Sequence, residues 1–301
     1  MANSTLVPEF LLEVFAETWE VRVLLSMLFL LVYLGSLLGN FIIIIATTVD
    51  HTLNTPMYFF LRNLSILDMG YVSVTAPNAC INSLTDNRSI SVAGCAAQIF
   101  LVFFSACVEI QFLTIMAQDR YVAICKPLLY PMIMNHQFCI QMTLASLLTS
   151  LILASVHTSK TFQLSFCHSN VVSQFFCDIP SLLKLSCTDT FNNKLLLFLS
   201  AIVFSGSCFT FIAIYVRILS TVLKVPLKGE RGKAFSTCVP HILWCLSLLV
   251  LLPMYISNLQ QSQKLRIHFL YFIPLFLHST LLSIVLETNR RRLRKCSNFS
   301  F

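Results

Sequence analysis

Two carboxylates stand inside long apolar stretches of the chain, and their position suggests chemistry. Asp68 and Glu109 each lie in a segment dominated by aliphatic and aromatic side chains. An ionisable side chain is costly to keep inside a membrane, so each is a functional candidate by default. The alternative is a protonated, hydrogen-bonded structural pair. A transporter or channel would also use such carboxylates, but the sequence shows neither an inverted repeat nor a pair of Gly- or Pro-broken helices.

Enzyme chemistry is not indicated by the other polar residues. The sequence has no Gly-rich phosphate loop and no His-Glu-x-x-His motif, and its 7 histidines show no metal-ligand spacing. His157 and His168 lie near the outer face and are interpreted as surface residues. We therefore expect neither an enzyme nor a protein with a cofactor.

The amino-acid composition excludes most soluble classes of protein. Of 301 residues, 56% are hydrophobic and only 11% are charged, whereas soluble domains have about 25% charged residues. So few charges cannot cover a soluble surface, which excludes a cytosolic globular enzyme, a disordered chain and a soluble nucleic-acid binder. The net charge of +7 is interpreted from where the charges lie, not as a sign of nucleic-acid binding.

Seven apolar segments are long enough to cross a bilayer, which takes roughly 20 mostly apolar residues per helix. The sequence predicts an all-α membrane protein, a bundle of seven transmembrane helices, with residues 1–301 as a single domain. Residues 1–22 are expected outside the cell, 23–287 in the bundle and 288–301 in a cytoplasmic tail. The predicted helices are 23–47, 57–81, 93–118, 139–158, 195–219, 235–256 and 267–287.

Charges, sequons and cysteines agree with an extracellular N-terminus. In that orientation thirteen of the 20 Lys and Arg residues fall on the cytoplasmic side, as membrane proteins prefer. The sequons at Asn3 and Asn87 lie outside as candidate glycosylation sites, although such triplets also arise by chance. Four cysteines face the oxidising side, and the residues alone leave their three possible pairings open. They are Cys95, Cys167, Cys177 and Cys187.

Several motifs resemble those of mammalian olfactory receptors, a group of rhodopsin-like G-protein-coupled receptors. They are 39–40 (GN) in the first helix, 56–61 (PMYFFL), 63–65 (NLS) and Asp68 in the second, 116–128 (MAQDRYVAICKPL) at the end of the third, 165–167 (SFC) and 175–180 (FFCDIP) in the second outer loop, and 233–238 (KAFSTC) at the start of the sixth. The resemblance covers about residues 1–243. Residues 73–77 (SVTAP) and 239–241 (VPH) look most like the fourteenth family of these receptors.

The resemblance implies an odorant receptor that activates a stimulatory G protein and raises cyclic AMP. Its partners would be a small odorant, the G protein and the lipid bilayer, without nucleic acid, in the plasma membrane of olfactory cilia. Asp119, Arg120 and Tyr121, with Tyr215 on the fifth helix, would form the coupling switch. Asp119 would hold Arg120 at rest, and Arg120 would turn toward the G protein on activation. The alternative is a snorkelling surface pair, and Gln118 replaces the Tyr that is usual in the family.

The resemblance also implies the disulfides Cys95–Cys177 and Cys167–Cys187. The first would tie the second outer loop to the third helix and form a lid over the cavity. A disulfide typically contributes about 2–4 kcal/mol, partly by restricting the unfolded chain.

Two further sites inside the bundle follow from the resemblance. Asp68 and Glu109 would face each other and, with Asn40, hold a sodium ion or share a proton. The ligand pocket would lie in the outer half, between the third, fifth and sixth helices, and suits a small, largely apolar volatile. Counting back by helical turns from Arg120 and Tyr215 gives its lining, with ordinary helix packing as the alternative for each residue. The predicted lining residues are Val102, Phe103, Ala106, Cys107, Leu199 and Val203.

The family pattern stops after Leu243. The seventh-helix motif Asn-Pro-x-x-Tyr is absent, and 278–288 (HSTLLSIVLET) stands in its place. Back-translation from the third base of His278 permits Phe-Asn-Pro-Ile-Ile-Tyr-Ser-Leu-Arg-Asn-Lys, and the same offset permits family-like sequence at 253–258. We hypothesise a one-nucleotide deletion near codon 243, which puts 244–301 out of frame. The alternative function is then a non-signalling product of a disrupted receptor gene, retained in the endoplasmic reticulum.

Overall fold

The computed structural model describes residues 9–13, 18–50, 55–85, 88–167, 170–224 and 242. Several sequence predictions fall outside this part of the chain. They are the sixth and seventh helices, the sequons at Asn3 and Asn87, the surface position of His168 and the out-of-frame segment 244–301.

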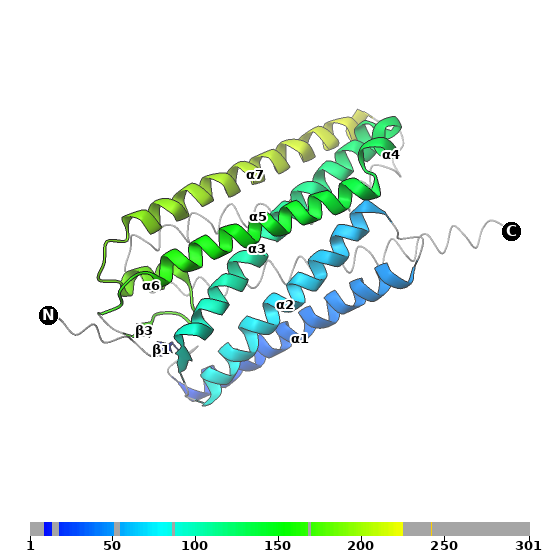
Figure 1. The fold of residues 1–301 in the computed structure, drawn as a ribbon. Helices are drawn as coiled ribbons and strands as arrows, with labels where there is room; N and C mark the ends of the chain where they lie inside the picture. Colours follow the sequence, from blue (N-terminus) through cyan, green and yellow to red (C-terminus); the bar gives the residue numbers. More distant parts are fainter. Residues whose placement is uncertain are drawn as a thin grey trace.

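Long helices dominate the described residues (Figure 1). They are α1 (Trp19–Val49), α2 (Pro56–Thr85), α3 (Val92–Cys125), α5 (His136–Phe162) and α7 (Phe191–Lys224). Between them lie the short helices η2 (Pro127–Leu129), α4 (Tyr130–Ile133) and α6 (Ile179–Leu185). Within the described part, α1, α3, α5 and α7 are long and apolar enough to cross a membrane.

Local sequence signals set where these helices begin and end. The Ser91 hydroxyl accepts a hydrogen bond from the Gly94 N–H at 3.1 Å and caps α3, and the Asn135 side chain caps α5 through the Phe138 N–H at 2.8 Å. At the other end of α3, Pro127 disfavours helical backbone at the residue before it. The 34 residues of α3 span about 51 Å at 1.5 Å per residue. That exceeds a hydrocarbon core of about 30 Å, so α3 extends beyond the predicted span 93–118.

Helix α3 lies at the centre of the described bundle. It packs against α2, α5 and α7, while α1 lies along α2 (Figure 1). The largest core cluster joins these helices through buried side chains such as Phe60, Phe112 and Tyr215. The rings of Phe60 and Phe112 meet edge to face at 5.5 Å. Elements that meet α3 can therefore pass a displacement along its length.

The inward face of α5 carries small and polar residues instead of large apolar ones. Leu144 and Leu148, in contrast, are exposed. This reverses the pattern of a soluble helix and is typical of helix packing in membranes, where small residues allow close approach and large ones face lipid. The buried residues of α5 are Cys139, Ser146, Ser150, Ala154, His157 and Thr161.

A small three-stranded sheet lies at the outer end of the bundle, which the sequence analysis did not predict. Its strands are β1 (Glu9–Leu12), β2 (Ser89–Ser91) and β3 (Val171–Val172), in the order β2-β1-β3. β1 is antiparallel to β2, with Phe10 opposite Ile90, and parallel to β3. Phe10 and Leu12 are buried among residues of α3 and the second outer loop. The segment expected as an outer tail thus contributes to the core.

Candidate ligand pocket and activation site

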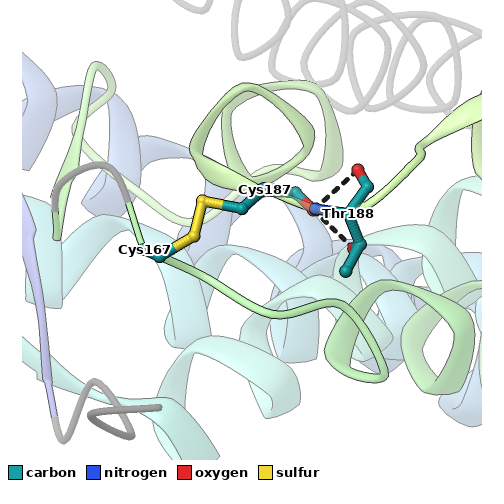
Figure 2. Close-up of a disulfide and its surroundings, with 4 residues drawn as sticks. Cys167, Cys187 and Thr188 are labelled. Carbon is teal, nitrogen blue, oxygen red and sulfur yellow. Dashed lines mark hydrogen bonds between the residues drawn. A yellow bond between two sulfur atoms is a disulfide. The ribbon is translucent and has the colours of Figure 1, made fainter. Parts of the chain in front are cut away.

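Two disulfides fix the second outer loop. Cys95 on α3 is bonded to Cys177, and Cys167 is bonded to Cys187; these are the pairs that the resemblance implied. Figure 2 shows the Cys167–Cys187 bond beside Thr188, whose N–H donates to the Ser186 hydroxyl at 3.2 Å. The second bond closes a loop of sequence separation 20 around Cys177. The loop is therefore attached both to the bundle and to itself.

Two aromatic residues of this loop reach into the bundle. Phe175 and Phe176 pack in one cluster with Phe29 of α1, Tyr71 of α2 and other α2 residues, and Val102 of α3 packs against that cluster. They fill the outer space between α1, α2 and α3.

Polar contacts hold the loop at this depth. The Gln98 side chain on α3 accepts a hydrogen bond from the Cys177 N–H at 2.9 Å. Asp178, the next residue, is buried at the start of α6. Burial raises the pKa of the Asp178 carboxyl to about 6, while hydrogen bonds from Ser181 and the charge of Lys184 lower it. The carboxylate is thus surrounded by groups of its own loop.

The structure distributes the four predicted pocket residues of α3 among different environments. Cys107 is fully buried, Val102 and Phe103 are half-buried, and Ala106 is exposed. Val102 packs against the Phe175–Phe176 cluster. Ala106 is thus the most accessible of the four, and its position, rather than that of the packed Cys107, is the candidate ligand contact.

The two predicted pocket residues of α7 are exposed, Leu199 at 51% and Val203 at 66%. Their place in the pocket stays a prediction, because the sixth helix lies outside the described residues. Leu199 and Val203 precede Tyr215 by 16 and 12 residues, which at 3.6 residues per turn places them on other faces of the helix than Tyr215. Near these positions, Ser200 of α7 contacts α5, and Phe204 contacts α3 with its ring 6.3 Å from that of Phe103.

The interpretation of His157 as a surface residue is wrong. Its side chain is 2% exposed. The Nε2 atom lies 2.9 Å from the Ser200 hydroxyl on α7, and the ring centroid lies 4.2 Å from that of Phe103 on α3. The residue type alone did not indicate that His157 is buried. Its helical spacing from the small and polar residues Ser146, Ser150 and Ala154, which are also buried, is the signal that could have shown it.

The intramembrane carboxylates lie together in the bundle. Asp68 of α2, Glu109 of α3 and Asn40 of α1 are all buried. Both carboxylates lie near enough to the buried Tyr71 hydroxyl for their charges to act on it. Asn40 donates to the Ser36 carbonyl of its own helix at 3.1 Å, which leaves its side-chain oxygen as a potential ligand. Among the described residues, no group of three or more His, Cys, Asp or Glu side chains could hold a metal ion.

At the cytoplasmic end of α3, Asp119 is held by a residue that the sequence analysis missed. The Tyr130 hydroxyl, from α4, donates to the buried Asp119 carboxylate at 2.8 Å. Burial, followed by the charge of Asp119 and this hydrogen bond, raises the pKa of the Tyr130 hydroxyl, so it remains a donor. No periodic pattern links residues 119 and 130, because a Pro-containing turn separates them.

The other switch residues lie around this pair. The Arg120 guanidinium contacts the Met57 sulfur on α2, while its charge also acts on Asp119. Tyr121 is half-buried, with the Lys126 ammonium 6.0 Å from its ring centroid. Tyr215 on α7 is buried, and its ring lies 4.7 Å from that of Phe211. Arg120 is therefore directed toward α2 in this structure, and Tyr130 provides the hydrogen bond to Asp119.

Comparison with known proteins identifies the family. A family model described as "Olfactory receptor" matches residues 29–287. The chain belongs to the olfactory receptor family. The predicted fold class is therefore confirmed: this olfactory receptor is a seven-transmembrane G-protein-coupled receptor, a multi-pass membrane protein and not an enzyme.

Individual relatives agree with the motif assignment to family 14. Human olfactory receptor 14C36 is 59% identical over 244 residues, which covers 81% of this chain and 78% of the relative. Human olfactory receptor 14A16 is 49% identical over 249 residues, with 82% and 81% covered. Human olfactory receptor OR9H1 is 38% identical over 307 residues, and the alignment covers 99% of this chain and 100% of the relative.

Proposed function

We propose that this olfactory receptor binds small, largely apolar volatiles in the outer half of its bundle. The observation that carries the proposal is the exposure of Ala106, a small side chain in the outer half of the central helix. Val102 and Phe103 lie one turn above Ala106, and the loop tied by Cys95–Cys177 lies beyond them. Small-molecule sites are mostly apolar hollows with few polar groups, which fits this lining.

We further propose that ligand binding activates a stimulatory G protein and raises cyclic AMP, in the plasma membrane of olfactory cilia. A ligand that binds the active state better than the resting state shifts the receptor population toward the active state. Ala106 lies about 20 Å along α3 from Asp119, at 1.5 Å per residue. At that end, release of Arg120 from its position against Met57 would present its guanidinium to the G protein.

The buried carboxylates support a proposal for a cation or proton site. Asp68 and Glu109 have only oxygen ligands to offer, as does the Asn40 amide carbonyl, and such ligands suit hard cations. A bound sodium ion would supply positive charge between the two carboxylates, and a shared proton would serve the same purpose. These residues would then link α1, α2 and α3 below the ligand position. Ion flux that depends on Asp68 or Glu109 would instead favour a transporter or channel.

The ligand site is tested by enlarging the side chain at position 106. Ala106→Leu places a larger side chain where the ligand would lie, and we expect the odorant concentration for half-maximal cyclic AMP to rise about tenfold or more. The probes are homologous series of aliphatic alcohols, aldehydes and carboxylic acids. Ala145→Leu makes the same change at an exposed position of α5 and should leave the response unchanged. Equal responses of both variants at equal surface amounts would contradict the site.

A second candidate function rests on the extent of the family-14 matches. The alignment to receptor 14C36 covers 244 residues, one more than the 243 residues that precede the proposed frame disruption. A chain that departs from its relatives there would lack the seventh-helix residues that relay activation in the family. It would then be a non-signalling membrane protein retained in the endoplasmic reticulum. Surface labelling together with the cyclic AMP measurement separates the two functions.

A further inference from the structure

His157 is a buried polar group for which the proposed function has no use. Its imidazole contacts Phe103 of α3 at 4.2 Å between ring centroids and hydrogen-bonds Ser200 of α7 at 2.9 Å. One side chain of α5 thus joins three helices in the outer half of the bundle. Ionisable residues inside membrane bundles are rare and are functional candidates by default.

The burial of the residues around Phe103 shows where His157 lies relative to the proposed ligand position. Ala106 is exposed, Phe103 is half-buried and His157 is buried. His157 is therefore a poor candidate for direct contact with a ligand beside Ala106, whereas Phe103 is a good one. The imidazole contacts the Phe103 ring from within the packed region between α3, α5 and α7.

We propose that His157 is a positioning residue of the odorant site, an inference that rests on the proposed ligand position. Through the Ser200 hydrogen bond it fixes α5 against α7, and through ring contact it fixes Phe103. Phe204 of α7, with its ring 6.3 Å from that of Phe103, bounds the same ring. The four side chains form one wall, which determines the length and shape of the apolar ligand body that fits.

The geometry also specifies what His157 does not select. The His157 Nε2 atom and the Ser200 hydroxyl bond to each other within the protein, so the proposed role assigns neither of these two atoms to a polar group on the ligand. Changing His157 should then alter the preference for chain length equally among alcohols, aldehydes and acids. Direct hydrogen bonding of His157 to the ligand would instead alter the preference among functional groups.

Three variants separate the two contacts of His157. His157→Phe keeps a ring against Phe103 but removes the hydrogen bond, and His157→Gln keeps hydrogen-bonding capacity but removes the ring. Ser200→Ala removes the hydrogen bond from the other side. The matched control is Ser207→Ala, because among the described residues the Ser207 hydroxyl donates locally, to the Val203 carbonyl of its own helix at 3.1 Å.

The expected result is a change in potency order within each homologous series. We expect shifts of up to about tenfold for the longer or bulkier members in His157→Phe and Ser200→Ala, the equivalent of one buried hydrogen bond. The same substitutions in a Phe103→Ala background should have little further effect, because residues that act through one another are not additive. Ser207→Ala should match the unchanged receptor.

Two patterns would overturn the positioning role. One is a uniform loss of response, or of surface amount, with the potency order retained, which indicates structural support alone. The other is an effect of His157→Phe that depends on the functional group of the ligand or persists fully without the Phe103 ring.

Ligand binding is measured separately, as the thermal stabilisation of the purified receptor by the same probes. Binding without cyclic AMP contradicts only the proposed coupling, and the potency order is then read from binding. Absence of binding overturns both proposals.

Discussion

Among single residues, Tyr130 offers the sharpest test of the activation site. Asp119 is buried, and a buried carboxylate that loses a donor costs about 1–3 kcal/mol or more. Tyr130→Phe removes the hydroxyl that donates to Asp119 at 2.8 Å and retains the ring. Asp119 would then compete for Arg120 and restrain it. We expect lower thermal stability of the purified receptor and a lower maximal cyclic AMP response, with the half-maximal odorant concentration unchanged.

A matched control is Tyr33→Phe, the same chemical change on α1. Tyr33 packs against the Phe175–Phe176 cluster. It should leave the maximal response intact. If Tyr130→Phe behaves like this control in both stability and maximal response, the hydrogen bond to Asp119 has no part in coupling.

Buried charged residues were easier to predict from the sequence than the side of a helix on which an apolar residue lies. Asp68, Glu109 and Asp119 stand out because charges are rare in apolar stretches, and all three are buried. Leu199 and Val203 carry no such mark, so their assignment depended on the helical phase, and an error of one residue rotates a side chain by about 100°. Tyr130 depends on a turn that brings it back to α3, which no local pattern encodes.

At the level of secondary structure, β1 is the element with the least expected role. Phe10 is 0% exposed, and its ring meets that of Phe166 edge to face at 5.3 Å. Deleting a buried Phe side chain costs about 3–5 kcal/mol. We expect Phe10→Ala to lower the temperature at which a thiol-reactive dye gains access to the buried cysteines. The reduced stability should also lower the amount of receptor at the cell surface.

The same strand supplies its own control. Glu9 is exposed, and surface substitutions away from special features usually change stability by less than about 0.5 kcal/mol. Glu9→Ala should therefore leave dye access unchanged. Equal behaviour of the two variants would mean that β1 does not contribute to the folded outer half.

The long helices and this strand differ in how far sequence can predict them. Apolar length alone marks α1, α3, α5 and α7, because a membrane-spanning helix satisfies its own backbone hydrogen bonds. Strand β1 has four residues and partners near residues 90 and 171, so its existence depends on contacts distant in sequence. Element boundaries also followed caps such as Ser91 and Asn135 more than hydropathy.

For the whole molecule, signalling competence depends on whether residues 244–301 are encoded in the family's reading frame. The family model extends to residue 287 and the OR9H1 alignment covers 99% of the chain, whereas the family-14 matches cover 81–82% for receptors 14C36 and 14A16. Under the frame hypothesis, conservation of apolar character through the shifted frame would account for both, because such a tail can resemble the family coarsely without close identity to it.

Nucleotide sequence across codons 235–290 from independent individuals decides between the two origins of this tail. We expect one base to be absent near codon 243, and its restoration to encode Asn-Pro-x-x-Tyr. The restored receptor should reach the cell surface in larger amounts than the present chain and raise cyclic AMP more strongly with the odorant series. The two chains share residues 1–243, so they share Ala106, His157 and Asp119, and any difference in response arises from the tail. An intact frame in every individual would contradict the hypothesis and assign the departure from the family motif to the receptor itself.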